Sequence, residues 1–345
     1  MSAGPEREAR LKVALILATP GSAWGGMEKH VADLAEALTS LKHEVHIIAH
    51  PDYRTHFPFA EFHPCPMKLS RNNPWLRWCV SRILKRVSPD IAHAHGNKAA
   101  LILGRLPHQT WQTVGTIHGS KSNLRPFLLL DKVIAVSGSI YEGLSHPSRH
   151  LIYNGIRKET PESPHGNYPL PETTNVIAAG RLEPVKGFDM LIQAWSMIHD
   201  RFPTAHLTIF GDGSEARNLH RLIDDKGLRH SLTMAGHQTT LASALSNADL
   251  MVLSSRREGF PYVLVEALMA GLPVVSTPVS GSVDLLPENA LARDSSAQAI
   301  ADVIASALNN LDGLQQSEQS AFDYAQTHLT LRGMAEATVR VYQAQ

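Results

Sequence analysis

The sequence predicts an α/β protein built from two doubly wound parallel sheets. Short apolar runs rich in β-branched residues alternate with amphipathic helical stretches, which is the pattern of parallel α/β domains. The chain has 345 residues, of which 43% are hydrophobic and 19% charged, so it is long enough and apolar enough to fill two cores. We therefore expect two domains, 1–165 and 166–330, followed by a C-terminal segment, 331–345.

Each element follows from its own pattern of apolar residues. Residues 11–19 form a nearly continuous apolar run of strand length, and residues 27–40 carry apolar side chains at helical spacing. The same criteria predict further strands of the first half at 44–49, 90–94, 113–117 and 132–136. In the second half they predict strands at 176–180, 205–210, 232–235, 250–253 and 273–276, and helices at 188–199, 214–225 and 262–270.

The stretch 157–174 separates the two halves. It contains four prolines and few apolar side chains, so we interpret it as a linker. Residues 331–342 again show helical spacing of apolar residues. Parallel α/β sheets bind ligands beyond the carboxyl ends of their strands, so two such domains present binding faces that can close around a cleft.

The net charge of zero hides an asymmetry between the two halves. Residues 1–160 carry 20 basic and 12 acidic side chains, whereas residues 161–345 carry 12 and 20. The stretch 62–89 has no carboxylate and contains two tryptophans, Trp75 and Trp78. Cations attract anionic surfaces and tryptophan favours the headgroup level of a bilayer, whereas a solvated helix face with inward tryptophans is the alternative. We expect docking on a membrane or an anionic lipid acceptor through 68–86, with Arg77, Arg82, Lys85 and Arg86 as contacts.

Membrane-spanning and secreted classes of protein are not indicated. No apolar run approaches the ~20 residues that cross a bilayer, and the N-terminus lacks the order of a secretion signal. Two cysteines, Cys65 and Cys79, are too few for a disulfide framework or a four-thiolate zinc site. We expect a cytoplasmic protein that associates at most with the inner face of the cytoplasmic membrane.

Two loops of the first half carry polar chemistry. Gly25-Gly26-Met27-Glu28 follows the first strand and opens a helix, so its amides can approach an anion; a plain tight turn is the alternative. His93 and His95 lie near the end of one strand, and His118 follows the next. A metal site of these three histidines is conceivable, but we expect His118 to contact a polar substrate and we expect no metal.

The strongest local signal is the loop after the strand at 176–180. Arg181 and Lys186 flank four residues, and Gly187 follows at the predicted start of a helix. Two cations beside the positive end of a helix would hold a diphosphate and stabilise charge on a departing phosphate. A surface loop of ion pairs is the alternative.

A pair of glutamates marks a second loop in this half. Glu258 lies in the predicted loop and Glu266 on the following helix, with seven residues between them. Carboxylates accept hydrogen bonds from paired hydroxyls, as a ribose or a sugar ring presents them. Glycoside hydrolases also use a pair of carboxylates for catalysis. The spacing alone does not decide between sugar binding and hydrolysis.

Together these segments resemble the retaining nucleotide-sugar glycosyltransferases of GT-B family 4, which have two Rossmann-like domains facing a cleft. The resemblance covers nearly the whole chain. Its specific pieces are the Arg181-to-Lys186 string and Ser-Arg-Arg-Glu-Gly-Phe-Pro-Tyr-Val-Leu-Val-Glu at 255–266. The less specific pieces are Gly25-Gly26-x-Glu28, Asp90-x-x-His93-x-His95, His118-Gly119, Val136-Ser137-x-Ser139, Asn154-Gly155-Ile156 and Gly211-Asp212-Gly213.

The resemblance implies transfer of a sugar from a nucleoside diphosphate donor to an acceptor hydroxyl, with retained anomeric configuration and without metal or cofactor. It assigns the diphosphate to Arg181 and Lys186, and the donor sugar to His118 and Glu258. It assigns donor binding to Gly25, Gly26, Gly211, Gly259, Phe260, Pro261, Val263 and Glu266, the last at the ribose. Glu28, on the acceptor side, would orient the glycine loop, and the C-terminal helix would cross back onto the first domain.

The expected acceptor is a glycolipid or oligosaccharide of bacterial lipopolysaccharide or another surface polysaccharide. Two other functions remain open: a nucleotide-sugar 2-epimerase of the same fold, and a non-catalytic protein that binds sugar nucleotides. A nucleic-acid partner is not expected. Two departures from the family pattern, Ser280–Asp284 in place of Gly-Gly-x-Pro-Glu and Tyr262 after Phe-Pro, put donor contacts at those positions in doubt.

Overall fold

The computed structural model describes residues 10–344 except for 22–23, 108–109, 120–122 and 158–172. The chain divides into two compact units. Unit 1 comprises residues 1–155 together with 331–345, and unit 2 comprises residues 156–330. The predicted boundary at residue 165 and most of the predicted linker lie outside the described residues.

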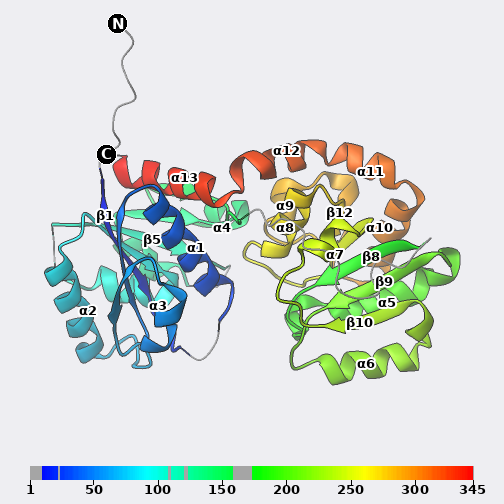
Figure 1. Ribbon diagram of the computed structural model, residues 1–345, viewed down its shortest axis with the longest axis horizontal. Coiled ribbons are helices and arrows are strands. Elements are labelled where there is room, and N and C mark those ends of the chain that lie inside the picture. Colours follow the sequence, from blue (N-terminus) through cyan, green and yellow to red (C-terminus); the bar gives the residue numbers. More distant parts are fainter. Residues whose placement is uncertain (1–9, 22–23, 108–109, 120–122, 158–172, 345) are drawn as a thin grey trace, which may run out of the picture. The chain divides into compact units, whose positions relative to one another are not determined.

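Unit 1 contains a parallel sheet of seven strands in the order β3-β2-β1-β4-β5-β6-β7 (Figure 1). The order runs outward in both directions from β1 and β4, so the crevice for a ligand in a doubly wound sheet lies where these two strands meet. The strands are β1 (Lys12–Leu17), β2 (Glu44–Ala49), β3 (Glu61–Pro64), β4 (Ile91–His95), β5 (Gln112–Ile117), β6 (Lys132–Ala135) and β7 (Arg149–Leu151).

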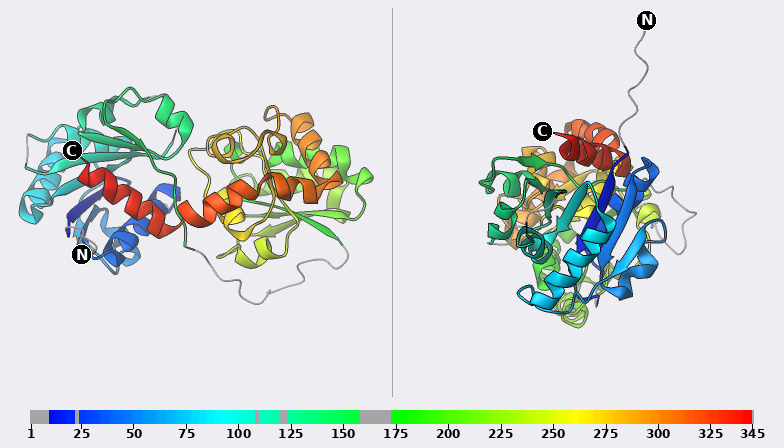
Figure 2. Two further views of the ribbon diagram at one scale, coloured as in Figure 1. Left: turned by 90° about the horizontal axis from the view of Figure 1, so that it is seen from above. Right: turned by 90° about the vertical axis from the view of Figure 1, so that its left-hand side faces the viewer.

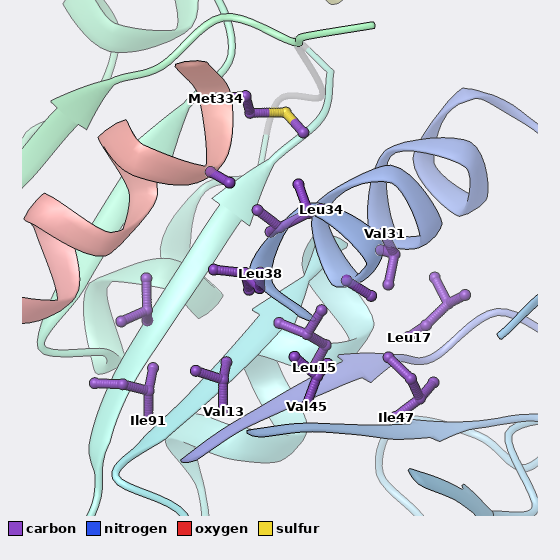
Figure 3. Packing of buried hydrophobic residues seen from close by; sticks show 14 of the residues in the cluster. Val13, Leu15, Leu17, Val31, Leu34, Leu38, Val45, Ile47, Ile91 and Met334 are labelled. Atoms are coloured by element: carbon purple, nitrogen blue, oxygen red, sulfur yellow. The ribbon is translucent and has the colours of Figure 1, made fainter. Parts of the chain in front are cut away.

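The core of unit 1 lies between this sheet and two helices, α1 (Gly26–Ser40) and α13 (Leu331–Gln343). Alternate residues of β1 face the helices, and Figure 3 shows Leu15 below leucines of α1, with Met334 of α13 at the other end of the same cluster. The C-terminal helix therefore belongs to unit 1 and lies beside α1 (Figures 1 and 2).

Polar contacts also join α13 to the sheet. The Tyr342 hydroxyl lies 2.7 Å from His93 Nδ1, and Lys132 Nζ donates to the carbonyl oxygen of Val341 at 2.8 Å. Both contacts are buried, so they fix the position of the helix in addition to its apolar packing.

Three further helices of unit 1 are α2 (Pro74–Val87), α3 (Gly96–Gly104) and α4 (Gly138–Glu142). Asn73 caps α2 by accepting from the amides of Trp75 and Leu76. The helix buries an apolar stripe at helical spacing, consisting of Leu76, Val80, Leu84 and Val87.

Unit 2 contains five parallel strands in the order β10-β9-β8-β11-β12, the same winding as in unit 1. They are β8 (Thr174–Ala179), β9 (Ala205–Phe210), β10 (Leu232–Gly236), β11 (Leu250–Leu253) and β12 (Val274–Ser276). The crevice of this sheet lies where β8 and β11 meet. The helices are α5 (Phe188–Ile198), α6 (Ala216–Asp225), α7 (Ala242–Ser246), α8 (Tyr262–Ala270), α9 (Ser282–Leu285), α10 (Ala297–Asn309), α11 (Leu311–Ser317) and α12 (Gln319–His328).

The predicted fold class of two doubly wound parallel sheets is confirmed. Every strand predicted from an apolar run is present, with ends that differ by up to two residues. The edge strands β3 and β7 were not predicted, because Glu61–Pro64 and Arg149–Leu151 are short and polar. Within the described residues, no helix combines the length and the apolar character that a bilayer crossing requires.

Candidate active site

The polar loops of unit 2 meet at its crevice. The loop 180–187 follows β8 and leads into α5, and the loop 254–261 follows β11 and leads into α8. Since β8 and β11 are adjacent parallel strands, their carboxyl ends lie side by side. Sheet topology thus brings together two loops that are about 70 residues apart in sequence.

Lys186 and Glu258 meet directly. Lys186 Nζ lies 2.6 Å from Glu258 Oε1, and the two side chains are only 18% and 13% exposed. The hydroxyl of Ser255 donates to the same carboxylate oxygen at 2.6 Å. The ammonium, the carboxylate and the hydroxyl form one polar cluster whose members are held within hydrogen-bonding distance.

The loop that carries Lys186 is held by backbone contacts. Gly187 adopts a φ of +66°, and a Cβ placed there would lie 2.1 Å from the carbonyl oxygen of Ser254. The Ser254 hydroxyl in turn donates to the Lys186 carbonyl oxygen at 3.0 Å. Only glycine fits where the two loops cross so closely. This crossing fixes the backbone position of the adjacent Lys186.

Arg256 anchors the second loop from the other side. Its guanidinium makes two hydrogen bonds to the Asp189 carboxylate, at 2.8 and 2.6 Å, and its backbone amide donates to the Val185 carbonyl oxygen at 2.8 Å. This fork geometry fixes α5 against the 254–261 loop.

Two helix N-termini end at this crevice. The residues that precede these helices, Gly187 before α5 and Pro261 before α8, provide no side-chain cap. Within α5, the Asp189 carboxylate accepts hydrogen bonds from the amides of Asp189 and Met190. The first turn of a helix has amides without an intrahelical partner and carries partial positive charge, so a helix end can bind an anion. In α5, Asp189 already occupies two of these amides, and the first turn of α8 is the better candidate. The cluster around Lys186 therefore lies at an electropositive edge of the sheet.

Arg181 does not join the cluster of Lys186 and Glu258. Its Nη1 lies 2.5 Å from Glu183 Oε1, and its side chain is 66% exposed. Glu266 lies on α8 and is half-buried, as is Val263. Arg181 is an exposed cation that an anionic ligand can attract away from Glu183, because exposed ion pairs contribute only about 0–1 kcal/mol.

Other predicted donor-binding residues shape the loops. At Gly211 a Cβ would lie 1.9 Å from the Gly180 carbonyl oxygen, so this glycine permits the close approach of two loops. Phe260 is buried, and Gly281, at φ +87°, packs against its ring, where a Cβ would lie 2.8 Å from a ring carbon. The divergent 280–284 segment thus supports the 258–261 loop from behind.

A cavity of about 460 Å³ adjoins the loop 183–185 but does not include Lys186 or Glu258. Its charged lining consists of Glu183, Asp189, Glu215, Arg256 and Arg257. Three carboxylates face two guanidinium groups there, and Asp189 already neutralises Arg256. This charge balance does not favour a diphosphate, so we place the anion site at the cluster of Lys186 and the helix ends.

In unit 1 the glycine turn opens α1. Glu28 is buried, and its Oε2 accepts a hydrogen bond from the Gly25 amide at 3.0 Å, while α1 begins at Gly26. The glutamate reaches back from the first helical turn and holds the glycine segment in place.

Histidines gather at the crevice of unit 1. His95 Nδ1 lies 3.2 Å from His118 Nε2, and the His30 ring lies 4.6 Å from the His118 ring between centroids. His30 Nδ1 lies 2.9 Å from Asn154 Oδ1. Burial lowers the pKa of His30 to about 4 and holds those of His95 and His118 well below the usual value, so the three imidazoles are neutral at pH 7.

His93 does not belong to this group. Its Nδ1 contacts the Tyr342 hydroxyl and its Nε2 contacts the Thr116 hydroxyl, both at 2.7 Å. Both ring nitrogens are therefore engaged, and the conceivable metal trio of His93, His95 and His118 is not formed. Its place beside His95 and His118 is taken by His30.

The basic face of α2 presents aromatic rings to solvent. Trp75 and Trp78 are 58% and 48% exposed and stack at 4.7 Å between centroids, and the Arg82 guanidinium lies 5.2 Å from the Trp78 centroid. The alternative of inward tryptophans is therefore wrong. Lys85 is exposed, Arg77 is partly buried, and Arg86 Nη2 lies 3.0 Å from His63 Nδ1.

Three functional neighbours were not singled out from sequence. Ser255 precedes the first glutamate, Asn154 lies in the Asn-Gly-Ile segment, and His30 lies on α1 one turn beyond the glycine pair. The first two stand inside the motif strings and were detectable there. His30 becomes recognisable only when the helix is placed against the strand ends.

Two doubly wound parallel-sheet domains, each with polar loops at its crevice, are the architecture of the GT-B glycosyltransferases. Sequence profiles agree: residues 165–324 match Glycosyl transferases group 1, and residues 24–160 match Glycosyltransferase Family 4. The chain belongs to the group 1, family 4 glycosyltransferases.

Alignments with individual relatives differ in how much of each chain they cover. The chain is 38% identical over 106 residues to the lipopolysaccharide core biosynthesis glycosyltransferase LpsE of Rhizobium meliloti, covering 31% of this chain and 30% of that protein. It is 24% identical over 365 residues to the phosphatidylinositol N-acetylglucosaminyltransferase GPI3 subunit of Saccharomyces cerevisiae, covering 92% and 79%. Three alignments at 30–38% identity span only 25–33% of the relatives' lengths.

Among solved structures, HepE of Anabaena in complex with UDP and glucose has a TM-score of 0.76 and 20% identity, covering 97% of this chain and 100% of that one. At this identity the likeness concerns the fold.

Proposed function

We propose that this glycosyltransferase moves a sugar from a nucleoside diphosphate sugar to an acceptor hydroxyl with retention of anomeric configuration and without a metal. The observation that carries the proposal is the cluster of Lys186, Glu258 and Ser255 beside the N-termini of α5 and α8. Once a diphosphate replaces Glu258 as its partner, the Lys186 ammonium would stabilise the charge of the leaving group, which is the task that a metal performs in other transferases.

Each residue has a role that follows from its group. Lys186 neutralises the diphosphate, and Arg181 moves from Glu183 onto it. The amides of α5 and α8 donate to phosphate oxygens. Glu258 accepts from a hydroxyl of the donor sugar, Glu266 accepts from the ribose hydroxyls, and His118 contacts the sugar from unit 1.

The reaction balances without a covalent enzyme intermediate. The bond between the anomeric carbon and the diphosphate oxygen breaks, and a bond forms from the acceptor oxygen to the same face of the sugar. The acceptor proton passes to the departing diphosphate. Catalysis then depends on positioning and on stabilising the charge of the leaving group.

The proposed acceptor is an anionic, lipid-linked glycan of the lipopolysaccharide type. LpsE is a lipopolysaccharide core glycosyltransferase and the yeast relative glycosylates phosphatidylinositol, so lipid-borne acceptors occur in both relatives. The exposed tryptophans and cations of α2 suit the headgroup region of an anionic bilayer.

Donor binding tests the proposal directly. We expect UDP or GDP, with their sugars, to raise the melting temperature in the presence of EDTA; a ligand at 100 times its Kd adds about 2.7 kcal/mol to the free energy of unfolding. NMR of the product with a matching acceptor should show the anomeric configuration of the donor. A requirement for added divalent metal, or an inverted product, would contradict the proposal, and a free epimerised sugar nucleotide would indicate the epimerase instead.

A further inference from the structure

The three histidines at the crevice of unit 1 are arranged as a ligand set. His30 comes from α1, His95 from the end of β4, and His118 follows β5. One nitrogen of each ring lies within 4.8 Å of the other two. A tetrahedral ion with bonds of about 2.0–2.1 Å holds its ligand atoms about 3.3 Å apart, so small side-chain movements close this set around an ion.

The partner of His30 prepares it to coordinate a metal. His30 Nδ1 lies 2.9 Å from Asn154 Oδ1, which can only accept, so Nδ1 carries the proton and Nε2 carries the lone pair. A metal-binding histidine typically donates its second N–H to an oxygen in this way, which fixes the tautomer and the ring orientation.

His95 has unused hydrogen-bonding capacity in the interior. It is 1% exposed, its Nδ1 faces only another imidazole, and its Nε2 has no partner among the described residues. An unsatisfied buried polar group costs about 1–3 kcal/mol, and in native proteins it often marks a functional group or a place for an ion.

A second group of possible ligands, His46, Glu61 and His63, does not meet the same criteria. Arg86 Nη2 donates to His63 Nδ1 at 3.0 Å, so the proton of this ring lies on Nε2, the nitrogen that faces His46. His46 Nε2 faces Glu44 at 3.0 Å. The chain from Arg86 to Glu44 satisfies each nitrogen and leaves no lone pair for a metal.

We propose that His30, His95 and His118 bind a transition-metal ion of the Zn²⁺ type, and that the bound ion withdraws His118 from the sugar nucleotide. His118 is half-buried, so the ion can enter on its side and keep a fourth position for water. Neutral imidazoles favour zinc, copper and nickel over magnesium and calcium. The inhibitory part rests on the proposed function, whereas the metal site itself does not.

Metal and donor then weaken each other's binding. An imidazole whose lone pair binds zinc cannot accept a hydrogen bond from a sugar hydroxyl, and the ion occupies space at the His118 ring. Because the coupling of two ligands is reciprocal, the donor must weaken zinc binding by the same factor by which zinc weakens donor binding.

Competition with a chromogenic chelator measures zinc binding in the absence of a sugar nucleotide. We expect one Zn²⁺ per wild-type chain, and His30→Asn, which keeps a donor toward Asn154, should weaken binding by more than about 100-fold, since loss of a second-shell group alone costs 10- to 100-fold. Glu61→Gln, in the second histidine group, is the matched control and should bind like wild type. If Glu61→Gln loses the ion and His30→Asn keeps it, or if wild type does not compete with the chelator, the proposal is overturned.

A second arm measures binding of UDP-glucose by calorimetry with and without one equivalent of Zn²⁺. Wild type should bind at least tenfold more weakly with zinc, and His30→Asn should be insensitive to it; equal binding by wild type overturns the inhibitory part. If the donor does not bind even in EDTA, the proposed donor fails while the chelator result stands on its own. Melting curves verify that His30→Asn is folded. The zinc competition and the UDP-glucose calorimetry are repeated with His95→Gln, which should behave like His30→Asn.

Discussion

Lys186 Nζ and Glu258 Oε1 lie 2.6 Å apart, so one ion pair joins the loops that follow β8 and β11. With both side chains largely buried, each charge depends on the other for compensation. A diphosphate that enters this crevice offers the ammonium a second anionic partner, while the carboxylate becomes available to a sugar hydroxyl. In the proposed function, this contact orders the two loops before a donor binds.

Replacing Lys186 should therefore remove catalysis. For Lys186→Met we expect kcat to fall by about 100- to 1,000-fold, the range typical for loss of one group that stabilises transition-state charge. Lys226→Met, at an exposed lysine of the same unit, is the control and should retain full activity. Glycosyl transfer to a supplied acceptor is the measurement, and wild-type turnover by Lys186→Met would remove the lysine from the site.

The crossing at Gly187 should not tolerate a side chain. Gly187→Ala must adopt φ +66° and also displace the Ser254 carbonyl, so we expect a loss of more than about 2 kcal/mol in the free energy of unfolding. Gly227 has nearly the same φ, +67°, but open space around its Cβ, so Gly227→Ala should cost only about 1–2 kcal/mol. Urea unfolding of the two variants separates steric overlap from backbone strain, because only Gly187→Ala has both. Equal losses in the free energy of unfolding would contradict the close crossing of the loops at Gly187.

The face of α2 should bind anionic vesicles. Each lysine or arginine near such a surface contributes about 1 kcal/mol, so the double variant Arg82→Ser, Lys85→Ser should weaken flotation with phosphatidylserine vesicles by about 10- to 30-fold. Arg217→Ser with Arg221→Ser, two exposed cations of α6, provides a control of equal charge. Should both pairs reduce flotation equally, binding would depend on net charge rather than on this helix.

Acid should destabilise the protein through its buried histidines. Burial lowers the pKa of His93 to about 3, below the unfolded value of 6.5. The stability that this neutral ring contributes is therefore complete above pH 6.5 and is lost progressively as the pH falls toward 3. His93→Gln cannot take up this proton, so its free energy of unfolding should fall by up to about 1.4 kcal/mol less per pH unit than that of wild type. Urea titrations from pH 7.5 to 4.5 provide the comparison, and parallel curves would show that folding does not lower the pKa of His93.

Local sequence patterns were sufficient for the sheets and for part of the site. The apolar run at 176–180 predicted β8, observed at Thr174–Ala179, and the string that follows it correctly located the loop of Lys186. Helical spacing at 331–342 likewise predicted α13. These predictions succeeded because burial of one face dictates a period that is visible within a few residues.

Contacts between distant segments were not predictable in this way. Nothing near Lys186 in sequence indicates that Glu258, 72 residues away, is its ion-pair partner. In unit 1, His93 pairs with Tyr342, 249 residues away, while His30 takes the place beside His95 and His118. The order of strands and the helix that packs on them decide these distances.

By itself the sequence determined the class of fold, the strand-to-helix loops that hold the polar groups, and the family to which the chain belongs. Only the tertiary structure decided which of those groups touch. The reason is physical: hydrophobic period is a property of a single segment, whereas an ion pair or a histidine cluster requires strands and helices from separate parts of the chain to end at the same edge of a sheet.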